Sequence, residues 1–149
     1  MTISIALLHG EGMEVVPDTM LWVSYTVTAD GYRHRILSRA ARSRVRLITS
    51  AHILNELARV LVEDFGRSQR FALLACRAIL HLARIVPVSP RGRRFVAADP
   101  NDDPIIETAL AGKADCIVTA DKPLLALGKV QDVEIIGIDE FVLRLPPEN

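Results

Sequence analysis

The 149-residue sequence has little cysteine, no net charge and no long hydrophobic run. Its two cysteines, Cys76 and Cys116, lack the paired spacing of a disulfide framework or a zinc site, so both are interpreted as small core residues. No apolar stretch approaches the roughly 18 residues of a membrane span, and the start MTISIALLHG has no basic segment before its short apolar run. We therefore expect a cytoplasmic protein without a membrane partner.

Aromatic residues make up only 5% of the chain, which makes base stacking a poor candidate for reading a nucleic-acid sequence. A net charge of zero also gives no bulk attraction to nucleic acid or membrane. The positive charges are nevertheless clustered, because residues 31–55 contain six arginines and no acid. A solvated helix face is the ordinary explanation for any single arginine. One guanidinium can, however, donate two hydrogen bonds to the oxygens of a phosphate, so the cluster suggests a phosphate-binding surface.

Hydrophobic periodicity predicts alternating strands and helices, hence a parallel sheet flanked by helices. Strands are expected at 13–17, 45–49, 116–120 and 133–138, with a short strand or extended link at 85–89. Helices are expected after residue 18 and at 31–44, 51–65, 68–84, 103–112, 122–127 and 139–145, with Ser50 and Asp139 as N-caps. We expect one domain over residues 13–145, an N-terminal extension over 1–12 and a tail over 146–149.

Acidic residues follow or flank the predicted strands at their carboxyl ends, where functional groups gather in an open parallel sheet. Asp18 directly follows the strand at 13–17, and Asp121 follows the strand at 116–120. Asp102 and Asp103 precede a helix that should begin near the same edge, although an N-cap role explains them equally well. Asp115 precedes its strand and is expected at the opposite edge.

Glu56 is the fourth acid of this set, in the second turn of the helix that follows the strand at 45–49. An ion pair with Arg59, or full solvation, explains it equally well. Glu107 could be an outer group of the site or simply solvated. Carboxylates brought together without partners repel one another and raise each other's pKa, so a cluster of them indicates a divalent metal. Oxygen ligands favour Mg²⁺ or Mn²⁺.

Four motifs together resemble the PIN-domain ribonuclease superfamily, in the branch that contains toxins of toxin-antitoxin systems. They are VVPDTM, SAHILNELARVL, DPNDDPIIETALAGKADCIVTADKPLLAL and VEIIGIDEFV, spread over residues 13–142. The third is the most specific. Met20 departs from the family pattern, which has Asn there to orient a carboxylate, and this departure implies weaker metal binding or a lower rate.

The resemblance implies a three-layer α/β/α sandwich with a mostly parallel central sheet, which binds Mg²⁺ or Mn²⁺ and hydrolyses RNA phosphodiester bonds. The catalytic residues that it implies are Asp18, Glu56, Asp103 and Asp121. The metal ligands are Asp18, Asp103 and Asp121, with Asp102 as the rival of Asp103. Supporting polar residues are Thr19, Ser24 and Thr119.

An RNA substrate, a partner antitoxin and a homodimer are further expectations from the same resemblance. The arginines expected to contact RNA are Arg33, Arg35, Arg39, Arg42, Arg91, Arg93 and Arg94. The alternative is a non-catalytic member of the same fold that binds RNA or protein through a weakened metal site, which Met20 motivates. A small-substrate phosphatase ranks last, because no glycine-rich phosphate loop accompanies the acids.

Overall fold

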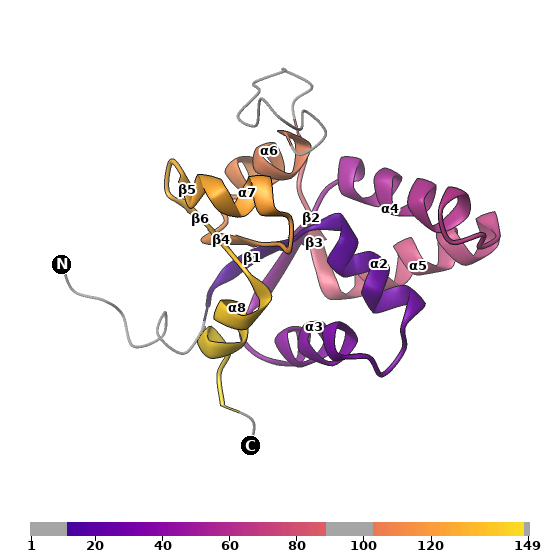
Figure 1. Cartoon of the computed structure of the whole chain (residues 1–149), viewed down its shortest axis with the longest axis horizontal. Helices are drawn as coiled ribbons and strands as arrows, with labels where there is room; N and C mark the ends of the chain where they lie inside the picture. Colours follow the sequence, from indigo (N-terminus) through magenta and orange to yellow (C-terminus); the bar gives the residue numbers. More distant parts are fainter. Residues whose placement is uncertain (1–11, 89–102, 148–149) are drawn as a thin grey trace.

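A six-stranded, mostly parallel sheet forms the centre of the protein (Figure 1). The computed structural model describes residues 12–88 and 103–147, and for Asp103 the backbone only. The strand order is β3-β2-β1-β4-β6-β5, and only β5 runs antiparallel to its neighbour. The strands are β1 (Glu14–Pro17), β2 (Arg46–Thr49), β3 (Ala83–Ile85), β4 (Cys116–Val118), β5 (Lys129–Val130) and β6 (Val133–Ile136).

Helices cover both faces of the sheet, which confirms the expected three-layer α/β/α architecture. They are α2 (Thr19–Val27), α3 (Tyr32–Arg42), α4 (Ala51–Glu63), α5 (Gln69–Leu82), α6 (Asp103–Ala111), α7 (Lys122–Leu127) and α8 (Ile138–Arg144). Figure 1 shows α6 and α7 on one side of the sheet and α3 and α8 on the other. Helices α2, α4 and α5 group together at the right of that view, where α4 contacts both of the others.

The hydrophobic core lies on both faces of the central strands, as their continuous apolar sequences predict. Val15 and Val16 of β1 and Ile117 of β4 are fully buried, and so is Trp22 of α2. Cys116 and the half-buried Cys76 are free thiols packed in or against this core, and burial raises the pKa of the Cys116 thiol to about 12. Within residues 12–88 and 103–147, no helix is both long and apolar enough to cross a membrane.

Three details of the predicted secondary structure are wrong, each because tertiary pairing or backbone geometry overrides local pattern. Strand β3 begins at Ala83, inside the expected helix, because Ala83 pairs with Leu47 of β2. The short β5 was not expected, and it forms by antiparallel pairing with β6. Helix α8 begins one residue early, with Gly137 as N-cap and no side-chain capping bond, so Asp139 lies in the first turn instead. Ser50 is confirmed as the N-cap of α4.

Candidate active site at the carboxyl ends of β1 and β4

The candidate site lies where the strand order of the sheet reverses. The chain passes from β1 to β2 and β3 on one side, and then returns to place β4 on the other side of β1. Such a switch point leaves a crevice at the carboxyl ends of the two strands. The register pairs Pro17 with Val118, and the Asp18 amide donates to the Val118 carbonyl at 2.9 Å. Asp18 and Thr119 therefore come side by side from positions 101 residues apart.

Asp18 is held by hydrogen bonds to both oxygens of its carboxylate. Its Oδ1 accepts from the Met20 amide at 2.9 Å, which makes Asp18 the N-cap of α2. Its Oδ2 accepts a short hydrogen bond from the Thr119 hydroxyl. The Asp18 residue is only 7% exposed, and Thr119 is fully buried. The carboxylate is thus fixed in one orientation at the floor of the switch point.

Asp121 is tied to Asp18 through Thr119. The Asp121 amide donates to the Thr119 hydroxyl oxygen at 3.0 Å, while that hydroxyl donates to Asp18. Asp121 caps α7, because its Oδ2 accepts from the Leu124 amide at 3.0 Å. Both acids are therefore genuine helix caps. In the part of the chain that the structure describes, the Asp121 Oδ1 has no hydrogen-bond donor, so it can serve as a ligand oxygen.

The surroundings of the Asp18 carboxylate disfavour its ionised form. Burial raises the pKa of Asp18 above its ordinary value of 3.8, and the nearby charge of Asp121 raises it further. The hydrogen bonds from Thr119 and the Met20 amide, together with the positive charge of Arg33, act in the opposite direction. Because the net direction is upward, the ionised form is unfavourable unless positive charge is added. A bound cation would supply that charge.

Three more of the predicted residues, Thr19, Glu56 and Ser24, are linked to this pair through helix α2. The buried Thr19 hydroxyl donates to Glu56 Oε2 at 3.4 Å, which brings the acid of α4 to the same end of the sheet. Ser24, one helical turn further on, donates to the Met20 carbonyl at 3.1 Å. The Met20 side chain is 45% exposed, so the residue that departs from the family pattern contributes its backbone amide but no polar side chain.

Helix α6 carries the third predicted acid, and its path can be followed from its contacts. Thr108 Oγ1 donates to the Pro104 carbonyl and lies 2.7 Å from Ser50 Oγ, at the carboxyl end of β2. Because the Thr108 proton goes to Pro104, the Ser50 hydroxyl donates to Thr108. The start of α6 therefore projects past the same edge of the sheet as Asp18. The backbone of Asp103 begins this helix, whereas its side chain and all of Asp102 lie outside the described residues.

Asp115 lies at the opposite edge, as expected. Its Oδ2 accepts from the amide of Glu14, the first residue of β1, at 2.8 Å. Glu107, one turn into α6, has a buried Oε1 for which the described residues provide no hydrogen-bond donor. It is therefore not a simply solvated acid.

The predicted RNA-contacting arginines have different surroundings. Arg33 is half-buried between α2 and α3, and Arg39 donates to the Pro146 carbonyl at 2.9 Å. Arg35 donates to the Asp30 carbonyl, and Arg42 is exposed. Three others, Arg91, Arg93 and Arg94, lie outside the described residues. A role in binding RNA remains a prediction for all seven.

A divalent cation suits the oxygens at this site. Asp18 and Asp121 present carboxylate oxygens, and the raised pKa of Asp18 reflects a charge that burial leaves uncompensated. Within residues 12–88 and 103–147, no three His, Cys, Asp or Glu side chains are grouped so as to hold a metal ion. Asp103, whose side chain lies outside the described residues, stays the predicted third ligand. The donor set fits Mg²⁺ or Mn²⁺ better than zinc.

Sequence reasoning missed several polar contacts in and beside the candidate site. The Met20 amide, the Ser50 and Thr108 hydroxyl pair and the central place of Thr119 between two carboxylates depend on contacts between distant segments. Thr119 carried a signal, because a hydroxyl two residues before an Asp can bond to that residue's amide. No local sequence signal predicts that Ser50 and Thr108 bond to each other, because 58 residues separate them.

Comparison with known proteins agrees with this geometry. No protein of curated function matches the sequence. Among solved structures, VapBC2 from Rickettsia felis, bound to a DNA fragment from its promoter, aligns with a TM-score of 0.63 at 15% identity, covering 84% of this chain and 98% of that chain. VapC20 of Mycobacterium tuberculosis, a toxin that cleaves the sarcin-ricin loop, aligns with a TM-score of 0.56 at 21% identity, covering 80% and 98%. At these identities the structures demonstrate a shared fold. The family model for the PIN domain matches residues 14–123, so the chain belongs to the PIN-domain family.

Proposed function

We propose that this protein is a divalent-metal-dependent endoribonuclease, and that it is the toxin of a toxin-antitoxin pair. The observation that carries the proposal is the chain from Asp18 through the Thr119 hydroxyl to the Asp121 amide, which links two acids at the switch point. Likeness to VapC20, whose description names a toxin that cleaves the sarcin-ricin loop, supports RNA as the substrate class. A cytoplasmic location, an antitoxin partner and a homodimer belong to the same proposal.

The residues proposed to hold Mg²⁺ or Mn²⁺ are Asp18, Asp121 and Asp103, with Asp102 as the rival of Asp103. When bound, such an ion supplies an activated water and neutralises charge on a phosphate. Thr119 keeps the Asp18 carboxylate in one rotamer, so the ligand oxygens need little reorganisation. Glu56, anchored by Thr19, is the proposed acceptor for the proton of the attacking water.

The test is cleavage of labelled RNA by purified protein with Mg²⁺ or Mn²⁺. Asp121→Asn keeps an acceptor for the α7 cap but removes a ligand charge, so activity should fall by about tenfold to a hundredfold or more. Asp115→Asn is the matched control, because it makes the same change at the opposite edge of the sheet. Absence of cleavage with either ion would sink the proposal, as would equal activity of the two variants.

A non-catalytic RNA-binding or protein-binding module is the second candidate function. It is favoured by Met20, whose exposed side chain offers no oxygen where the family pattern has an amide. Calorimetric titration with Mn²⁺ separates the two candidates. Heat of binding that disappears in Asp18→Asn argues against the non-catalytic module, whereas RNA binding without any response to Mn²⁺ argues for it.

A further inference from the structure

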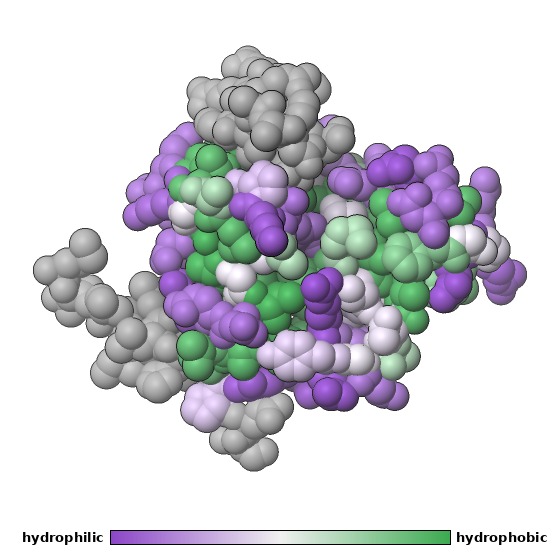
Figure 2. All heavy atoms as spheres, in the orientation of Figure 1, coloured by the Kyte–Doolittle hydropathy of each residue, from purple (hydrophilic) through white to green (hydrophobic). Residues whose placement is uncertain are grey.

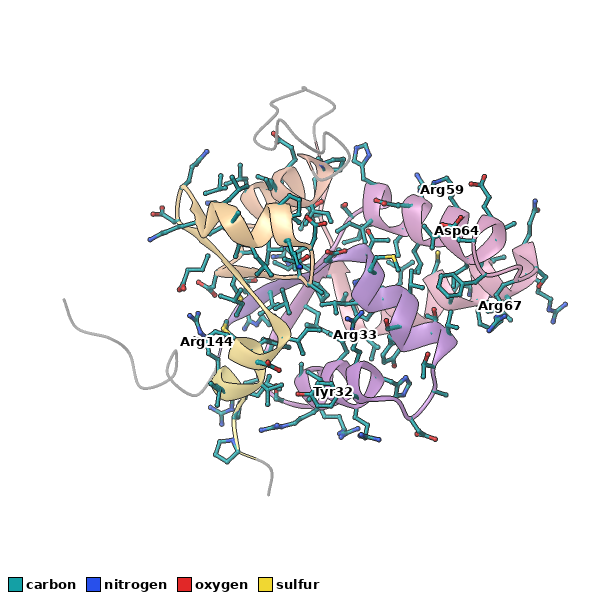
Figure 3. The ribbon with its side chains drawn as sticks, viewed as in Figure 1. Tyr32, Arg33, Arg59, Asp64, Arg67 and Arg144 are labelled. Carbon is teal, nitrogen blue, oxygen red and sulfur yellow. The ribbon has the colours of Figure 1, made fainter. Side chains whose placement is uncertain are left out.

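Arg33 occupies an unusual position for an arginine. It lies in the first turn of α3, half-buried, and lines a small apolar depression with Leu21 of α2, Val118 of β4 and Phe141 of α8. Figure 3 shows its side chain in the space between these helices, and Figure 2 shows hydrophobic atoms reaching the surface there beside strongly hydrophilic ones. Val118 directly precedes Thr119, so the depression borders the acid site.

The guanidinium of Arg33 makes one hydrogen bond within the described residues. Its Nη1 donates to the Ser24 hydroxyl at 3.2 Å, a neutral partner that is itself bonded to the Met20 carbonyl. Among the residues that the structure describes, no carboxylate lies within ion-pairing distance of it, whereas Arg84 and Arg144 each pair with glutamates. A partly desolvated guanidinium whose other N–H groups have no acceptor among the described residues is suited to an anion that arrives from solution.

The start of α3 holds this side chain in place. His34 Nδ1 donates to the Tyr25 carbonyl at 2.8 Å, and the two rings stack with centroids 4.3 Å apart and planes 10° apart. Gly31 caps the helix where a Cβ atom would come within 2.8 Å of the Thr28 side chain. Because α2 and α3 are joined by these contacts, the guanidinium is presented by a preorganised turn, which lowers the entropy cost of binding.

We propose that Arg33 binds the phosphate of the RNA strand that lies on the acid site, as a substrate-positioning residue. The planar guanidinium can donate two parallel hydrogen bonds to a phosphate, which a lysine cannot copy. The carboxylates of the acid site repel a phosphate diester, and the nearby positive charge of Arg33 offsets that repulsion. The charge of Arg33 already acts on Asp18, whose pKa it lowers against the larger effect of burial. This inference rests on the proposed function for the identity of the substrate.

The experiment measures binding and cleavage of a short fluorescein-labelled single-stranded RNA by Arg33→Met, Arg33→Lys and the control Arg77→Met. Arg77→Met removes the same charge from an exposed position on α5, far along the chain from the acids. Binding is followed by fluorescence anisotropy in the Asp121→Asn background, and cleavage is followed with Asp121 intact. Circular dichroism and urea unfolding check that each variant folds.

We expect Arg33→Met to weaken RNA binding and lower kcat/KM by about tenfold or more, the usual effect of losing a charge-assisted hydrogen-bond pair. Arg33→Lys should recover part of the loss, and Arg77→Met should stay within about twofold of its parent. The slope of log affinity against log salt should become shallower by about 0.7 in Arg33→Met.

Equal behaviour of Arg33→Met and Arg77→Met overturns this role for Arg33, even if the protein cleaves RNA. Full recovery in Arg33→Lys also contradicts it, because a point charge would then suffice.

Failure of the nuclease proposal gives a different set of results. If the wild-type protein binds RNA without cutting it, and Arg33→Met still weakens binding, the enzyme proposal falls while phosphate binding by Arg33 stands. If the wild-type protein binds no RNA, both fall.

Discussion

Replacement of Thr119 by Val tests whether its hydroxyl holds the acid site together. Val has nearly the same shape, but it cannot donate to Asp18 or accept from the Asp121 amide. A hydrogen bond to a charged group stabilises a protein by about 1.5–3 kcal/mol, and a neutral one by about 1 kcal/mol. Because Thr119 is fully buried, water cannot easily replace the hydroxyl. We therefore expect Thr119→Val to lower the free energy of unfolding by about 3 kcal/mol at neutral pH.

Thr119→Ser is the matched control, because it keeps the hydroxyl and removes a buried methyl group at a cost of about 1 kcal/mol. Urea unfolding followed by circular dichroism measures both variants in metal-free buffer. If Thr119→Val is no less stable than Thr119→Ser, the hydroxyl does not orient the two acids, and the geometric basis of the proposed site is wrong.

The same pair of variants has a distinct pH dependence. The pKa of folded Asp18 lies above 3.8, so as pH rises from 3.8 through the folded value, the folded protein must ionise a buried group and loses stability. Thr119 stabilises the ionised form of Asp18 most. The extra destabilisation of Thr119→Val over Thr119→Ser should therefore be largest above the folded pKa and should shrink as pH falls through it.

Two further substitutions test the surroundings of the site. Asp18→Asn removes a buried charge and its repulsion with Asp121 but retains an N-cap acceptor, so the metal-free protein should become more stable at neutral pH. Added Mn²⁺ should raise the Tm of the wild type only. A loss of stability in metal-free Asp18→Asn would contradict this reasoning. Ser50→Ala should lower the free energy of unfolding in urea by about 2 kcal/mol, because it removes both the cap of α4 and the bond to Thr108. Ser68→Ala removes only the exposed cap of α5 and should lower it by about 1 kcal/mol. Equal losses would show that the buried hydroxyl pair adds no stability.

Much of the secondary structure was predictable because it depends on local pattern. The apolar runs at β1, β2, β4 and β6 are buried on both faces, and their spacing from helices predicts parallel crossovers. Ser50 is recognisable as a cap because the stabilising bond reaches only three residues ahead. The failures lie where the decisive contact is distant. Ala83 has helical periodicity behind it, but pairing with Leu47 makes it a strand.

The candidate site was predictable in its parts and not in its arrangement. That Asp18 and Asp121 each follow a strand can be read from local sequence, and the structure links the two through Thr119. Ser24 was expected only as a polar neighbour of Asp18, whereas its hydroxyl accepts from Arg33 of the next helix. Such a bond depends on how two helices pack, and no local pattern encodes the packing angle.

Local periodicity and side-chain chemistry are enough to predict the alternation of strands and helices, the placement of the acids at the carboxyl ends of strands and the oxygen ligands of the candidate metal site. The tertiary structure places β4 next to β1, so that Thr119 joins two acids across 101 residues. It also decided that Arg33 remains without an acidic partner among the described residues. Strand order and helix packing set these contacts, and both result from burying the whole apolar surface at once.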